Sequence, residues 1–233
     1  MGFFEKLKMR KAMLMHQNDD LLGAKEAYEK LYAAGNYSAY YMLHYSVLLL
    51  REGGEENYLK VKEILKKAEK AKDMNEVRRQ QLWMNYAVAE YKLGDLPKAI
   101  HMLESMHKRG RSGLIYGSLG FLYIEAGDAE KALEFNMEAY EYDDEDPVTL
   151  DNLGQIYYRL LNDKEKAKGY FEKAIEIKDT QIDTLYFLST YDIAEGKYAE
   201  AKEKLEKALG GRFSPLNYAT KEMVEKALSE LPA

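Results

Sequence analysis

Apolar residues recur at helical spacing along most of this chain. In residues 80–93, Trp83, Tyr86 and Ala87 follow the i, i+3, i+4 spacing that places side chains on one face of a helix. A longer period is superimposed on this spacing. Alanines recur every 33 to 35 residues, at Ala99, Ala132, Ala167 and Ala201. A fixed period of this length predicts an array of helical repeats.

Turn residues separate the helical segments at the same period. The four short segments concerned are GDLPKAI (94–100), GDAEKAL (127–133), NDKEKAK (162–168) and GKYAEAK (196–202). Upstream of two of these turns, Gly120 and Gly154 lie 34 residues apart, so a second helix carries the same period. Each unit is therefore predicted to be a helix, a turn of the Gly-Asp type and a second helix.

Residues 116–139 resemble the tetratricopeptide repeat (TPR). The residues that carry this resemblance are Tyr116, Leu119, Gly120, Tyr123, Gly127, Asp128, Ala132 and Ala139. The resemblance implies an all-α, right-handed superhelical α-solenoid of about six helix pairs, in one domain over residues 1–233. The expected units are about 1–36, 37–74, 75–112, 113–146, 147–181 and 182–213, followed by a capping helix over 215–231.

Three places depart from the regular repeat. One extra residue in 159–161 is expected to lengthen the first helix of its unit, and residues 53–57 are expected to form an enlarged turn. Ser214 followed by Pro215 predicts the start of the last helix, because Ser caps free amides and proline fits the first turn. The apolar side of that helix is expected to cover the end of the array, since an open terminal repeat would expose apolar surface.

A second stripe on the first helices of the units is the main functional clue. It is largely apolar, and in the TPR family it lines a concave groove that receives an extended peptide or a helix. The candidate groove residues are Met84, Asn85, Val88, Tyr91, Lys92, Phe121, Ile124, Gln155, Tyr158, Arg159, Tyr186 and Thr190. The resemblance thus implies a non-enzymatic adaptor or scaffold that binds a partner protein through aromatic and apolar contacts. Part of the stripe is equally compatible with ordinary core, because first helices of successive repeats also touch one another.

One subtype of the family does not fit this sequence. The carboxylate clamp grips acidic C-terminal tails with lysine and arginine side chains, and Asn85 and Asn152 match only its asparagine position. Leu114, Ser118, Asp183 and Phe187 stand where the clamp carries its cations. Recognition is therefore expected to rely on aromatic and apolar groups.

Composition and charge narrow the classes of partner and the cellular compartment that we expect. The net charge of −6 argues against a general nucleic-acid binder, which needs a basic face to displace counterions from phosphates. The chain has no cysteine, which excludes disulfides and fits a reducing compartment. No apolar run approaches the length of a membrane span. We therefore expect a cytoplasmic protein that contacts another protein and no nucleic acid.

No catalytic or metal-binding pattern is found in the sequence. The four histidines show no His-Glu-x-x-His spacing, and the chain has no phosphate loop or dinucleotide fingerprint. Gly117-Ser118-Leu119-Gly120 lacks the spacing of a nucleophile elbow. We expect no enzymatic activity, no metal and no cofactor.

Two alternatives to the adaptor function remain open. The groove could receive the terminal helix of a second copy, which would make a self-associating structural protein. The other alternative is a peripheral membrane scaffold, because residues 3–15 combine Phe3, Phe4, Leu7, Leu14 and Met15 with Lys6, Lys8, Arg10 and Lys11. The first helix of an array also needs an apolar face for packing, so the sequence favours packing over membrane contact.

Overall fold

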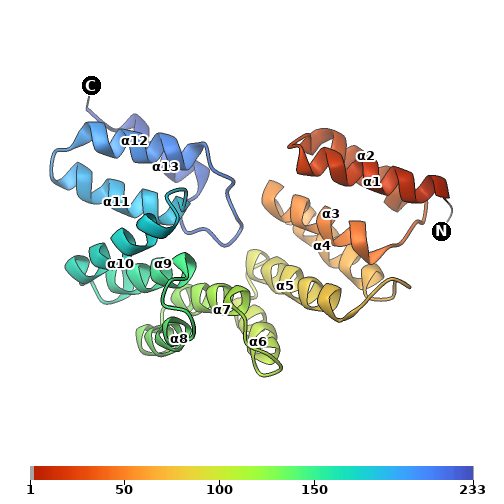
Figure 1. Ribbon diagram of the computed structural model, residues 1–233, viewed down its shortest axis with the longest axis horizontal. Helices are drawn as coiled ribbons and strands as arrows, with labels where there is room; N and C mark the ends of the chain where they lie inside the picture. The colour runs from red at the N-terminus through yellow and green to blue at the C-terminus, as the bar shows by residue number, and fades with distance from the viewer. Residues whose placement is uncertain (1–2, 233) are drawn as a thin grey trace. The chain divides into compact units, whose positions relative to one another are not determined.

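The computed structural model describes residues 3–232, and these residues form helices joined by short turns (Figure 1). Thirteen α-helices and one short π-helix, with no strand, account for the regular structure of the described residues. The bounds are α1 Phe3–Gln17, α2 Leu21–Ala33, α3 Ala39–Glu52, α4 Glu55–Ala68, α5 Glu76–Lys92, α6 Leu96–His107, α7 Gly113–Ala126, α8 Ala129–Tyr142, α9 Pro147–Gln155, η1 Ile156–Leu160, α10 Lys164–Ile177, α11 Ile182–Ala194, α12 Tyr198–Leu209 and α13 Lys221–Ser229. The predicted all-α repeat fold is confirmed.

The chain divides into two compact units, Met1–Leu103 and Glu104–Ala233, and the boundary between them in the sequence falls within α6. In the first unit, α1 packs on α2 and α3 packs on α4. In the second unit, α7 packs on α8, α9 on α10 and α11 on α12. Helices consecutive in sequence are thus neighbours in space, as short connections between antiparallel helices require.

The recurrent glycines of the second unit are sites of close helix approach. A side chain at Gly154 would place its Cβ 2.5 Å from the ring of Phe171, which is fully buried on α10. A Cβ at Gly120 would lie 2.3 Å from the amide oxygen of Asn136 on α8. The 34-residue glycine period therefore marks where the first helix of a pair touches the second.

The extra residue near 159–161 does not extend an α-helix. The helix continues from α9 into η1, where the amide of Leu161 donates to the carbonyl of Ile156 at 3.0 Å, a π-helical bond across five residues. A π-bulge absorbs one inserted residue without breaking the helix. The chain then turns at Asn162 (φ 53°), and Asp163 caps α10. The turn at residues 53–57 is also smaller than expected, because α4 already begins at Glu55 and only Gly53 and Gly54 lie between the helices.

The last helix begins later than the sequence predicts. It starts at Lys221 with Thr220 as its cap, and Pro215 lies in an irregular segment before it. The physical reason is Asp183 of α11. Its carboxylate accepts hydrogen bonds from the amides of Tyr218 (3.0 Å) and Ala219 (2.9 Å), and a helix starting at Pro215 would place these amides inside the helix. From Thr220 onward, α13 packs on α12 and buries Val224.

Candidate functional site

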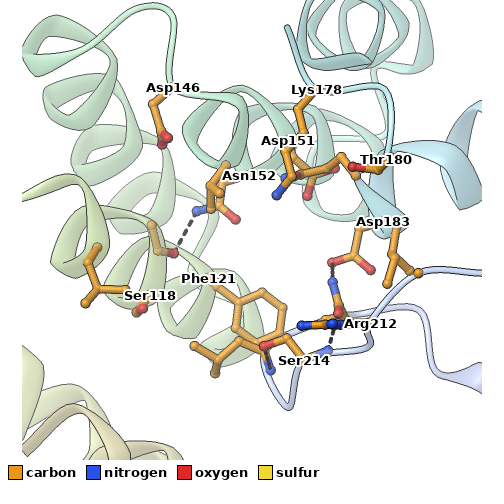
Figure 2. Close-up of a pocket in the computed structure, with 18 of the residues that line it drawn as sticks. Ser118, Phe121, Asp146, Asp151, Asn152, Lys178, Thr180, Asp183, Arg212 and Ser214 are labelled. Carbon is orange, nitrogen blue, oxygen red and sulfur yellow. Dashed lines mark hydrogen bonds between the residues drawn. The ribbon is translucent and has the colours of Figure 1, made fainter. Parts of the chain in front are cut away.

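An open pocket of about 710 Å³ lies within the second unit. The helices α7, α9 and α11, each the first of its pair, supply half of its lining residues. The segment after α12 and the residues just before α9 and α11 supply the other half. Figure 2 shows the labelled side chains around the opening, with Ser118 and Phe121 from α7 and Asp151 and Asn152 from α9. Three successive repeats thus contribute to one site.

Large apolar side chains and exposed cations line the same pocket. Leu114 is 61% exposed and Val148 is 37% exposed, although both are large apolar residues. Leu216 and the largely buried Phe121 add apolar surface. Lys178 and Arg212 are exposed and belong to the same lining. The pocket therefore combines apolar and polar contact groups.

Two buried aspartates stiffen the wall of this pocket. Asp151 accepts hydrogen bonds from the hydroxyl of Thr184 (2.6 Å) and the amide of Gln155 (2.8 Å), which ties α9 to α11. Asp183 holds the segment after α12 through Tyr218 and Ala219, and also through the Asn217 side chain at 3.1 Å. Figure 2 shows Asp183 on the side of the opening where Arg212 and Ser214 lie.

Burial makes these two carboxyls unusual in their protonation. It raises the pKa of Asp151 to about 7, with the charge of Asp183 contributing further and the hydrogen bonds from Thr184 and Gln155 acting in the opposite direction. Burial also raises the pKa of Asp183, against the lowering effect of its three hydrogen-bond donors. A carboxylate held away from water is disfavoured relative to the acid.

A series of side-chain hydrogen bonds continues from Asp151 through Gln155 to Arg159 in η1. Arg159 donates to the side-chain oxygen of Gln155 (2.9 Å) and pairs with Glu125 of α7 at 2.8 Å. Its guanidinium also lies 4.0 Å from the ring centre of Tyr218. The π-helical turn places Arg159 where it joins α7, α9 and the C-terminal segment of the second unit.

Most of the predicted groove residues pack within the fold, and one of them lines the pocket. Of the twelve, only Phe121 belongs to the lining of this pocket. Ile124 and Gln155 are buried, as are Met84, Asn85 and Val88 of α5 in the first unit. Asn85 donates to Ser46 at 2.8 Å and to the carbonyl of Leu43, a bond between first helices of successive pairs.

The remaining predicted residues are partly exposed but are engaged within the fold. Lys92 lies 4.9 Å from the ring centre of Tyr91 in the first unit. In the second unit, Tyr158 shares a hydrogen bond of 3.2 Å with Thr190, and Tyr186 packs against Phe187 and Tyr218. The three side chains of the second unit thus contact residues of neighbouring segments, whereas the contact of Lys92 with Tyr91 lies within α5.

The pocket residues that the stripe missed carried a signal in the sequence. Leu114, Ser118 and Asp183 occupy the clamp positions, and all three line the pocket with Asn152. Those positions are the ligand-facing ones in the clamp subtype, so the family pattern located them although their chemistry differs. Asn152 donates to the carbonyl of Gly117 at 3.0 Å and so links α9 to α7. The contribution of the segment 210–217 had no sequence signal.

Comparison with known proteins agrees with the helix-pair architecture. The family model described as tetratricopeptide repeat matches residues 149–181, which comprise most of α9, η1 and α10. Residues 149–181 therefore match one tetratricopeptide repeat, and the helix pairs of the chain as a whole resemble those of TPR proteins. Over 101 residues it is 33% identical to the Sol locus transcriptional repressor of Clostridium acetobutylicum, a match that covers 42% of this chain and 30% of the repressor.

Solved TPR structures are similar in fold. A thermophilic TPR protein of Thermus thermophilus has a TM-score of 0.63 at 18% identity, covering 82% of this chain and 97% of its own. The C-terminal part of a TPR repeat-containing protein of Cytophaga hutchinsonii has a TM-score of 0.57 at 20% identity, covering 87% and 78%. The APC/C hetero-tetramer Cut9–Hcn1 gives 0.56 at 17% identity, covering 96% of this chain and 48% of the matched chain. These identities show the fold alone.

Metal clusters and membrane-spanning helices are not found among the described residues. Within residues 3–232, no three or more His, Asp or Glu side chains gather in a way that could hold a metal ion. None of the helices described there is both long and apolar enough to cross a membrane. TPR arrays generally serve as protein–protein interaction scaffolds.

Proposed function

We propose that this protein is an adaptor whose second unit binds an extended segment of a partner protein in the pocket between α7, α9, α11 and residues 210–217. The observation that carries the proposal is the exposure of Leu114 and Val148 within a pocket of about 710 Å³. Large apolar side chains that line a concavity favour a ligand that removes them from water.

The polar groups of the pocket suit a peptide. An extended peptide carries amide and carbonyl groups that need hydrogen-bond partners when they leave water. The hydroxyls of Ser118, Thr180 and Ser214 line the pocket beside the apolar groups. Recognition would therefore combine apolar side-chain contacts with hydrogen bonds to the peptide backbone.

The rigidity of the wall also supports this function. The hydrogen bonds of Asp151 and Asp183 fix α9, α11 and the C-terminal segment relative to one another. A pocket that is ordered before binding loses less conformational freedom when a ligand binds. The two buried aspartates are thus assigned to positioning the pocket.

The test is affinity capture from the native host with three forms of the full chain. Leu114→Asp places a charge in the pocket, and Leu161→Asp makes the same change at another exposed leucine of the second unit (61% and 41% exposed). We expect the wild type and Leu161→Asp to capture the same partner and Leu114→Asp to lose it. Equal capture by all three forms would refute binding in this pocket. If the chain instead captures only itself, the self-associating alternative holds.

A further inference from the structure

The first helix carries two apolar faces, and only one is covered. Met9, Ala12 and Met13 are buried, on the side where α1 packs on α2. Phe4, Leu7 and Leu14 are 76%, 54% and 46% exposed. At 100° per residue, these three lie on the side of the helix opposite the buried three. The packing side of α1 is therefore formed by Met9, Ala12 and Met13 rather than by Phe4, Leu7 and Leu14, and the side chain of Phe3 lies outside the described part of the structure.

The start of α2 also carries exposed apolar side chains. Leu21 is 49% exposed and Leu22 is 73% exposed, immediately after the turn that joins the two helices. Five large apolar side chains of the first helix pair thus keep between 46% and 76% of their surface exposed. Single exposed apolar residues are ordinary, but a group of this kind marks an interaction surface.

The charges of α1 indicate what the surface contacts. Lys6, Lys8, Arg10 and Lys11 are all exposed, and Glu5 is the only carboxylate of the helix. The whole chain has a net charge of −6, so this cationic helix is unlike the rest of the protein. Lys8 and Arg10 lie on either side of the exposed apolar stripe, because they are separated by 200° around the helix axis.

A small pocket lies beside the stripe. It has a volume of about 370 Å³ and is lined by Ala12, Met15, Ala27 and Leu31 together with Lys8, Lys11 and Lys30. Lys30 also pairs with Glu26 at 3.4 Å. Apolar surface next to lysines is the combination that accommodates the boundary between lipid headgroups and acyl chains.

We propose that the α1–α2 surface docks on an anionic lipid bilayer. Phe4, Leu7, Leu14 and Leu22 enter the headgroup and acyl boundary, while the four cations of α1 contact anionic headgroups. A protein partner would satisfy the apolar stripe equally well, but cations on both flanks of a stripe match a surface that is negative in every direction. The adaptor would then present its second-unit pocket to partners near a membrane.

The experiment is co-sedimentation of the full chain with vesicles. One set contains phosphatidylcholine alone and the other contains 30% phosphatidylglycerol. We expect binding to the anionic vesicles that is at least tenfold tighter than to the neutral ones, and that weakens with added salt because exposed charges are screened. An absence of binding to anionic vesicles would overturn the proposal.

Matched variants separate the two contributions. Leu7→Asp with Leu14→Asp should reduce binding at least tenfold, whereas Leu59→Asp with Val77→Asp should not, although these control residues of the first unit are also exposed (52% and 76%). The double variant Lys8→Glu with Lys11→Glu should reduce vesicle binding to a similar extent. Its control, Lys66→Glu with Lys70→Glu, changes the charge by the same amount on α4 and just after it, and it should have a much smaller effect. Equal losses in test and control variants would overturn the assignment of this surface.

Light scattering of the same proteins tests the competing occupant. If the wild type is a dimer that Leu7→Asp with Leu14→Asp converts to a monomer, and neither form binds vesicles, the stripe is an interface between two copies and the proposal is wrong. Circular dichroism of each variant establishes that the helices remain folded. The proposal concerns the first unit alone, so a failed pocket variant in the second unit leaves it unaffected.

Discussion

Replacing Asp151 by Asn should make the protein more stable at neutral pH and less sensitive to pH. The carboxyl of Asp151 is buried, and its pKa is raised from 3.8 to about 7. Because the pKa of this carboxyl is higher in the folded state than in the unfolded state, folding favours its protonated form. Its stabilising effect is present below about pH 4 and is lost as the pH rises through about 7.

The size of the effect follows from the shift. About three pKa units at about 1.4 kcal/mol each correspond to about 4 kcal/mol of unfolding free energy lost between pH 4 and pH 8. The asparagine side chain cannot ionise. It retains an acceptor for Thr184 but loses the bond from Gln155, at a cost of about 1 kcal/mol at every pH. D151N should therefore be about 1 kcal/mol less stable than the wild type at pH 4 and about 3 kcal/mol more stable at pH 8.

Urea unfolding followed by circular dichroism at several pH values measures this difference. Subtracting the wild-type curve removes the contributions of distant carboxyls, such as Glu63, whose pKa is lowered to about 2 by hydrogen bonds from Tyr32 and Lys60. Asp144→Asn, at an exposed loop position, controls for the loss of one negative charge. A difference that stays constant from pH 4 to pH 8 would refute the reasoning, because it would mean that Asp151 ionises in the fold as it does in water.

Three further predictions concern packing and the C-terminal segment. Gly154→Ala should lower the free energy of unfolding by about 1–3 kcal/mol, since its Cβ would meet Phe171. Gly169→Ala lies within α10 with no atom near its Cβ, so it should raise the free energy of unfolding by up to about 1 kcal/mol; urea midpoints of the two variants test this pair. Truncation after Arg212 should lower the free energy of unfolding by at least about 3 kcal/mol and cause aggregation, because it removes the hydrogen-bond donors to Asp183 and exposes the surface that Val224 covers. A truncated chain that melts like the full chain would contradict this prediction. Asn162→Ala should destabilise by about 1 kcal/mol, because alanine tolerates the positive φ poorly, and Asn162→Gly, which relieves it, should not, as thermal melts will show.

The sequence predicted the helix pairs because their period rests on local signals. Small residues such as Gly154 and Ala167 stand where helices touch, and the turn glycines stand where φ is positive. The start of the last helix was mispredicted for a different reason. Ser214-Pro215 is a good local signal, but the backbone donors of residues 218 and 219 are required by Asp183, about 35 residues earlier. Helix propensity along the chain contains no information on hydrogen bonds between residues so far apart in the sequence.

The candidate site was predicted only in part. The stripe containing Gln155 and Ile124 reaches the pocket only at Phe121, and in an array where first helices also touch one another the two faces have similar composition. An inserted residue hidden as a π-bulge further alters which way Tyr158 and Arg159 face. The exposed faces of α1 could not be distinguished from its packing face by periodicity, because both are apolar.

The adaptor function is tested most directly by photo-crosslinking in the native host. A photoreactive amino acid is placed at Leu114 or Val148 in the pocket, or at Leu161 as a control, and crosslinked peptides are identified by mass spectrometry. The account predicts that positions 114 and 148 crosslink to the same segment of another protein and that position 161 does not. Crosslinks of equal yield from position 161, or none from the two pocket positions while a partner is still captured, would contradict it.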